Sequence, residues 1–199
     1  MSQKVATQLR HEGEPVKGSR FIATVFPVAD EASAKHALLE IRAEMPDAGH
    51  HCWAWRIASP AIERASDDGE PGGSAGRPIL AQLTGRDLVD TAVIVTRFWG
   101  GTKLGVGGLV RAYGGAAGQV LDLAPIEQWV AMITATLIHD HGDTDAITRV
   151  LAAHGAVDSE AEYGVHVTRT LQVPGTSKEA LTAAVADATS GRADLTFDA

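Results

Sequence analysis

VIVTRFWGGTKLGVGGLVRAYGGAAG, residues 93–118, is the stretch around which the first part of the chain is organised. Its apolar start, Val93–Val95, is typical of a buried strand. Its end predicts a helix, because apolar residues recur there at helical spacing: Leu109, Val110, Tyr113, Ala116, Ala117, Val120 and Leu121. Between the two, five of the nine residues 100–108 are glycine. A strand, a glycine-rich loop and a helix in this order can turn backbone N–H groups and a helix N-terminus toward an anion.

The glycine-rich loop and the cations around it form a candidate phosphate site. Its members are Arg97, Gly100, Gly101, Lys103, Gly105, Gly107, Gly108 and Arg111. The loop fits neither standard nucleotide motif: Gly105 is followed by Val106 rather than Lys-Ser/Thr, and the dinucleotide pattern begun at Gly105 would need a glycine at Val110. ATP and NAD are therefore not expected as ligands. The structural alternative is a tight connection whose glycines only supply positive φ.

Composition describes a globular protein, with 45% hydrophobic and 21% charged residues. No apolar run reaches the roughly 20 residues of a membrane span, and the N-terminal residues lack the apolar core of a secretory signal. The single cysteine rules out an internal disulfide framework. These features predict a cytoplasmic protein without membrane contact. A monomer or weak dimer is expected, although none of these features fixes the oligomeric state.

The net charge of −8 argues against indiscriminate binding to nucleic acid, because such binding depends on phosphate neutralisation. The charge is also unevenly distributed. Residues 1–128 carry 13 Lys+Arg and 15 Asp+Glu, a net of −2, whereas residues 129–199 carry 4 and 10, a net of −6. A phosphate-binding surface is therefore expected in the first part of the chain.

Periodicity and turn residues divide the chain into a flexible arm at residues 1–18, a first domain at 19–126 and a second at 127–199. Within the first domain, residues 59–74 lack periodicity and are rich in glycine, proline and acid, which predicts a long surface loop. In the second domain the predicted order is β-α-β-β-α-β, the ferredoxin-like arrangement. The fold class predicted for the whole chain is α+β.

A second candidate set is made of His50, Cys52, Asp67, Asp68 and Glu70. His50 and Cys52 lie two apart on a predicted strand and so share a face, whereas His51 points to the other one. Two such ligands without a partner pair are a weak zinc signal, and a polar wall of a site or plain packing is favoured over zinc. The three acids could hold Mg²⁺ or act as acid and base, but a solvated charge run is favoured over both. No metal or cofactor is predicted.

Several segments together resemble the IMPACT family, and its bacterial YigZ-like branch in particular. They are Ser19–Ala23, His50–Trp55, Ser66–Pro71, Gly76–Leu80 and Arg97–Gly115. The resemblance implies a first domain similar to domain IV of elongation factor G and a ferredoxin-like second domain similar to its domain V. It also implies a link to translational control, with RNA or the ribosome as partner and no established reaction.

Three functional hypotheses follow. The preferred one is a binding module that holds a phosphate of RNA at the loop and the following helix, with help from Arg97, Lys103 and Arg111. The second is an enzyme for a phosphate-bearing small substrate, in which the acidic loop supplies ligands or a base and His50 or Cys52 a further polar group. The third is an adaptor for a protein partner, which rests on the eukaryotic relatives alone.

Overall fold

The computed structural model describes residues 2–198, which divide into two units between Trp129 and Val130. Each unit contains helices and an antiparallel sheet, so the predicted α+β class is confirmed. The sequence suggested a break after residue 126. The observed break lies slightly later, because residues 126–128 form a strand of the first unit. No helix among the described residues is long and apolar enough to cross a membrane.

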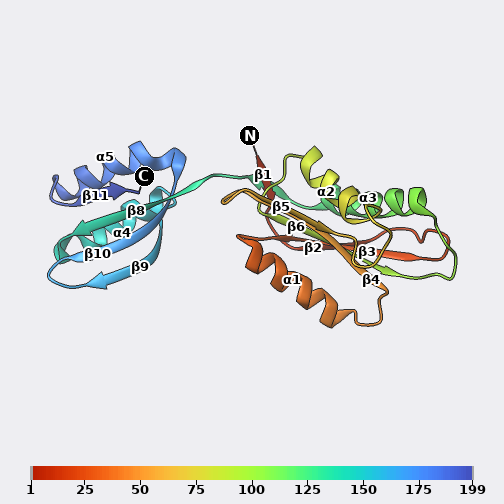
Figure 1. Cartoon of the computed structure of the whole chain (residues 1–199). Coiled ribbons are helices and arrows are strands. Elements are labelled where there is room, and N and C mark those ends of the chain that lie inside the picture. The colour runs from red at the N-terminus through yellow and green to blue at the C-terminus, as the bar shows by residue number, and fades with distance from the viewer. Residues whose placement is uncertain (1, 199) are drawn as a thin grey trace. The chain divides into compact units, whose positions relative to one another are not determined.

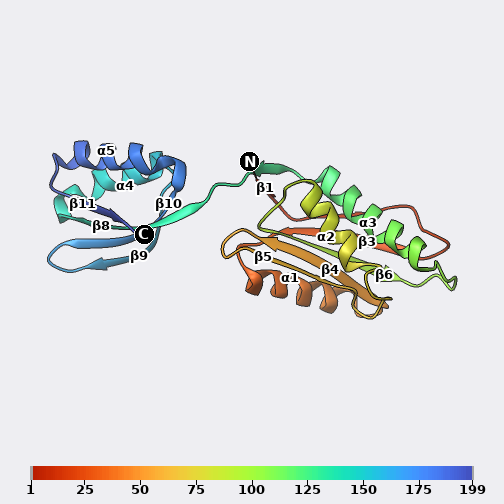
Figure 2. The same ribbon diagram turned by 45° about the horizontal axis from the view of Figure 1, so that its top comes forward.

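The first unit is built on a five-stranded antiparallel sheet in the order β2-β3-β6-β4-β5 (Figure 1). Its strands are β2 (Leu9–Glu12), β3 (Arg20–Pro27), β6 (Thr91–Phe98), β4 (His50–Ile57) and β5 (Ile62–Ser66). Figure 2 shows α1 (Glu31–Glu44) on one face of this sheet, with α2 (Gly76–Gly85) and α3 (Val106–Leu123) on the other. The central strand β6 is thereby buried on both faces, as the apolar run Val93–Val95 predicted.

Alternation along the strands sorts side chains between the two layers. On β4, Cys52 and Ala54 pack with α2 and α3, whereas Trp55 and Ile57 pack with α1. The rings of Trp53 and Trp55 stack with their centroids 3.7 Å apart. The two tryptophans therefore share one face of the sheet, opposite Cys52.

Two segments expected to be loose are ordered into strands. Within the predicted flexible arm, β1 (Gln3–Val5) pairs with β7 (Ile126–Gln128), and β2 pairs with β3. Within the predicted loop 59–74, β5 pairs with β4, so the loop proper begins after Ser66. β2 and β5 are short and lie at the two edges of the five-stranded sheet, where much of each strand stays exposed and the hydrophobic pattern is weak.

Glycines inside α3 mark a close approach to α2. A Cβ added at Gly114 would meet Pro78 Cβ at 3.5 Å, and one added at Gly118 would meet Gln82 Oε1 at 3.1 Å. This accounts for glycine at two helix positions where it is intrinsically unfavourable. Gly115, between them, faces open space.

The second unit follows the order β8, α4, β9, β10, α5, β11, which confirms the predicted βαββαβ arrangement. The elements are β8 (Met132–His139), α4 (Thr144–Ala153), β9 (Val157–Tyr163), β10 (Val167–Pro174), α5 (Lys178–Thr189) and β11 (Asp194–Phe197). Its antiparallel sheet has the order β11-β8-β10-β9, with the two helices over one face. Its core is a single apolar cluster that includes Leu137, Ile147, Leu171 and Leu181.

Candidate functional site

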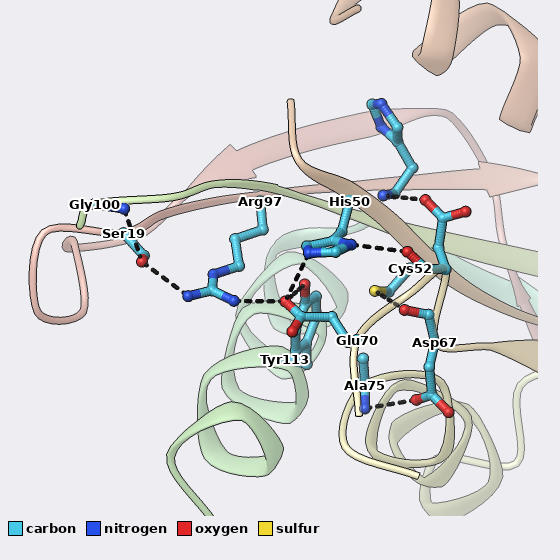
Figure 3. Close-up of polar contacts among 11 residues, drawn as sticks. Ser19, His50, Cys52, Asp67, Glu70, Ala75, Arg97, Gly100 and Tyr113 are labelled. Atoms are coloured by element: carbon cyan, nitrogen blue, oxygen red, sulfur yellow. Dashed lines mark hydrogen bonds and ion pairs between the residues drawn. The ribbon is translucent and has the colours of Figure 1, made fainter. Parts of the chain in front are cut away.

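The centre of the first unit's polar cluster is an ion pair between Arg97 on β6 and Glu70 in the loop after β5 (Figure 3). Arg97 Nη1 lies 2.6 Å from Glu70 Oε1, and only 7% and 4% of the two side chains are exposed. Tyr113 of α3 donates its hydroxyl to the same oxygen at 2.8 Å. Burial raises the pKa of Tyr113, so the phenol stays protonated and acts as a donor. The buried carboxylate is thus neutralised by one cation and oriented by one phenol.

Arg97 is therefore not the surface cation that the sequence suggested. Its Nη2 donates to Ser19 Oγ at 3.2 Å, and that oxygen also accepts the amide of Gly100 at 3.1 Å. Arg97 ties the end of β6 to the start of β3 and compensates Glu70. Its Nε is buried and has no partner among residues 2–198.

Asp67 holds the acidic loop in shape. Its Oδ1 accepts the amides of Ala75 and Gly76, each at 2.8 Å, and its Oδ2 accepts that of Gly73 at 2.7 Å. Burial acts to raise the pKa of Asp67, but these amides and Arg77 together outweigh it and lower the pKa below the usual value. The carboxylate organises the start of α2, and its oxygens are engaged.

Asp68 is engaged as well. Its Oδ1 lies 2.5 Å from Arg42 Nη2, and its Oδ2 accepts the amide of His51 at 2.7 Å. Its backbone carbonyl accepts Nδ1–H of His50 at 2.8 Å, which leaves His50 Nε2 3.9 Å from Glu70 Oε1. The prediction that the acids form a solvated charge run is therefore wrong for these positions, because each carboxylate has specific partners.

His50 and Cys52 lie on the Arg97 side of the sheet, whereas His51 lies on the other face beside Thr96, as strand alternation predicted. Burial lowers the pKa of His51. Within residues 2–198 no group of three or more His, Cys, Asp and Glu side chains is arranged to hold a metal ion. His50 and Cys52 both bond to backbone carbonyls of the acidic loop.

Cys52 is fully buried, and its thiol donates to the carbonyl of Asp67 at 3.0 Å. Burial raises the pKa of this thiol from 9.0 to about 12. A protonated thiol is a poor nucleophile. Cys52 therefore stabilises the acidic loop and is not prepared for covalent chemistry.

A thiol-specific reagent should consequently modify the native protein at pH 7.5 at least about 100-fold more slowly than the urea-unfolded chain. Because the folded pKa is raised, the stabilising contribution of Cys52 is fully present below pH 9 and is lost as pH rises from 9 toward 12. Labelling kinetics followed by mass spectrometry give a clean readout, since Cys52 is the only cysteine. Equal rates in native and unfolded protein would contradict the assignment.

The glycine-rich loop keeps its amides free, with one exception. Gly100 donates to Ser19 Oγ, but the amides of residues 101–108 donate to no group within the described chain. α3 begins at Val106, and its N-cap Gly105 has φ +72°, a conformation that favours glycine. The glycines build the turn, and the turn leaves a row of N–H groups at a helix N-terminus.

Two of the three predicted cations are exposed around this row. Lys103 lines a pocket of about 410 Å³ at the start of α3, and Arg111 lines a smaller hollow of about 210 Å³ together with Lys17. The structure adds Lys17 and Trp99, which the sequence interpretation missed. Trp99 directly follows the buried strand β6, and 65% of its side chain is exposed. The sequence signal was a large aromatic residue at the point where the apolar strand gives way to the glycine-rich loop.

The larger pocket, called here the α3 pocket, is lined by nine residues: Glu70, Pro71, Arg97, Trp99, Lys103, Leu104, Gly105, Val106 and Leu109. It joins the two candidate sets, because the buried ion pair lies on the same cavity as Lys103 and the helix N-terminus. The pocket lining does not include the other members of the second candidate set, His50, Cys52, Asp67 and Asp68. His50 and Cys52 contact the pocket only indirectly, by bonding to the loop that carries Glu70.

Residues 17–121 match the Impact N-terminal domain, and this range includes the ion pair, the acidic loop and the glycine-rich loop. The chain belongs to the IMPACT family. Residues 137–192 match a domain of unknown function, DUF1949, in the second unit.

Relatives of the same length share both units. The IMPACT family member YigZ of Escherichia coli is 36% identical over 92% of this chain and 91% of that protein. An IMPACT family member of Haemophilus influenzae is 32% identical over 90% and 88%. A crystal structure described as a hypothetical protein is 32% identical, with a TM-score of 0.79 over 100% of this chain and 97% of the other. The YigZ-like two-domain architecture is thus common to this IMPACT family member and its relatives.

Proposed function

We propose that the glycine-rich loop and the first turn of α3 bind phosphate groups of RNA, free or in the ribosome, and that this binding serves a translation-associated role. The observation that carries the proposal is the row of amides at residues 101–108 that have no partner in the described chain. A helix N-terminus adds a partial positive charge at the same place. The translational role itself is supported by membership of the IMPACT family.

Exposed cations on both sides of the row support the same ligand. Lys103 lies on the α3 pocket, and Lys17 and Arg111 lie on the smaller hollow next to it. Backbone amides and lysine or arginine side chains are the groups that proteins use to hold nucleic-acid phosphates. Few phosphates are contacted, so affinity should be modest and should fall with salt.

The double variant Lys103→Ala/Arg111→Ala should bind a single-stranded RNA octamer at least about 10-fold more weakly than the wild type at 100 mM salt, because charge-assisted hydrogen bonds to phosphate are lost. The slope of log K against log salt should fall by about 1.5, the value for two phosphate contacts on a single strand. Fluorescence anisotropy over a salt series measures both quantities.

A matched control removes the same charge elsewhere in the first unit. Lys35 and Arg64 are exposed to the same extent, 61% of each side chain, and each contacts Glu31, on the α1 side. The variant Lys35→Ala/Arg64→Ala should retain wild-type affinity and salt slope. If both double variants bind equally well, phosphate recognition at the loop is refuted.

The enzyme hypothesis finds little support in the same geometry. Asp67 and Asp68 have all their carboxylate oxygens engaged, and the Cys52 thiol is protonated. No specific contact favours the adaptor hypothesis over the binding module. RNA binding is therefore the function that these residues support best.

A further inference from the structure

The buried pair Glu70 and Arg97 forms the polar floor of the α3 pocket, and one carboxylate oxygen of this pair has no hydrogen-bond donor from the described chain. Glu70 is 96% buried as a side chain, yet both of its hydrogen bonds and its His50 contact go to Oε1. Oε2 has no partner in the described chain and, unlike Arg97 Nε, is not sealed from solvent. A carboxylate oxygen that faces the pocket and has no donor from the protein can accept one from a ligand.

The charges around the pocket restrict what that donor can be. The floor is neutral, because Arg97 compensates Glu70, while Lys103 and the N-terminus of α3 make the rim positive. A cationic side chain from a protein would be repelled at the rim. The geometry instead fits a ligand that carries a neutral donor group at one end and an anionic group at the other.

The lining of the pocket includes exposed apolar side chains, one of which is a flat aromatic ring. Trp99 is 65% exposed and Val106 is 57% exposed, at the place where the loop leads into α3. Exposed tryptophan beside cations is the platform that proteins use to stack bases of single-stranded nucleic acid. The volume of about 410 Å³ lies in the usual range of small-molecule pockets, about 300–1,000 Å³.

We propose that the α3 pocket takes one nucleotide of single-stranded RNA whose base carries an exocyclic amino group. The base stacks on Trp99 and donates its amino group to Glu70 Oε2, and its phosphate lies against Lys103 and the free amides at the start of α3. This assignment rests on the proposed RNA binding and names the class of nucleotide that the site selects.

The amino-group contact is tested on the RNA, because Glu70 also compensates Arg97 and its replacement would disturb the fold. Adenosine, cytidine and guanosine octamers are compared with octamers of purine riboside, pyrimidin-2-one riboside and inosine, which lack only the exocyclic amino group. In at least one pair the amino-bearing octamer should bind about 3- to 10-fold more tightly, the worth of one hydrogen bond. Equal affinity within all three pairs overturns the proposal.

Stacking is tested by Trp99→Ala, with Trp99→Phe as the conservative variant. Trp99→Ala should weaken binding of the preferred octamer by about 5- to 100-fold, and Trp99→Phe should restore most of the loss. Circular dichroism should show both variants folded, since Trp99 is exposed. If Trp99→Ala binds as tightly as the wild type while Lys103→Ala/Arg111→Ala binds more weakly, the base pocket is refuted and phosphate binding stands. If neither variant loses affinity, both proposals are refuted.

A lysine-rich peptide of eight residues serves as the competing macromolecule. The positive rim predicts that it binds the wild type at least 10-fold more weakly than the preferred RNA octamer. Tighter binding of the peptide, weakened by Trp99→Ala, would assign the pocket to a protein partner and overturn the RNA proposal.

Discussion

Gly100→Ala should destabilise the first unit by at least about 3 kcal/mol, or prevent it from folding. A Cβ at this position would lie 1.9 Å from Gly18 C, 2.1 Å from Gly18 O and 2.3 Å from the amide nitrogen of Ser19. Overpacking in a core typically costs about 1–3 kcal/mol even when side chains can move away. Here every obstructing atom belongs to the backbone, so two chain segments have to separate.

The separation would also break the bonds that converge on Ser19. Its hydroxyl accepts the amide of Gly100 and Arg97 Nη2, and this junction holds the loop against the start of β3. Urea unfolding followed by circular dichroism measures the loss. Gly115→Ala is the matched control: its Cβ meets nothing within 4 Å, and alanine in a helix interior should stabilise by about 0.5–1 kcal/mol. A Gly100→Ala protein as stable as wild type would disprove the close crossing.

Arg97→Met should cost about 3–5 kcal/mol, because it leaves the Glu70 carboxylate buried without its counter-charge. Glu70→Gln should cost less, since the amide keeps the shape and can still accept from Tyr113, but it leaves the guanidinium uncompensated. The double variant Arg97→Met/Glu70→Gln removes both charges and should recover a large part of the loss.

A double-mutant cycle built from these three proteins isolates the coupling between the two side chains. A coupling free energy of at least about 2 kcal/mol is expected for a pair this close and this buried. Additive losses would show that the two charges are screened from each other by water. In that case Arg97 would be free to meet a phosphate after all.

Local pattern predicted what depends on near neighbours in the chain. The strand at Val93–Val95, the helix after the loop and the shared face of His50 and Cys52 all follow from periodicity, and the structure contains each of them. The βαββαβ order of the second unit was also predictable, because its central strands follow the alternating pattern, most clearly β10 with its buried and half-buried positions.

What depends on distant partners was not predictable. Glu70 and Arg97 lie 27 residues apart, and they meet only because Asp67 bends the acidic loop back through the amides of Gly73 and Ala75. No spacing rule distinguishes such an inward carboxylate from a solvated one. The role of Gly100 was hidden for a similar reason, since the partner that excludes a side chain there lies 82 residues earlier, at Gly18.

The pairing of β1 with β7 has a consequence for how the protein is made. Gln3 is synthesised well before its partner Gln128, which follows only when the rest of the first unit has been made. Val5, fully buried in the finished core, pairs with Ile126 and depends on the same late strand. The sheet of β1 and β7 therefore cannot form during synthesis before the chain has been made through residue 128.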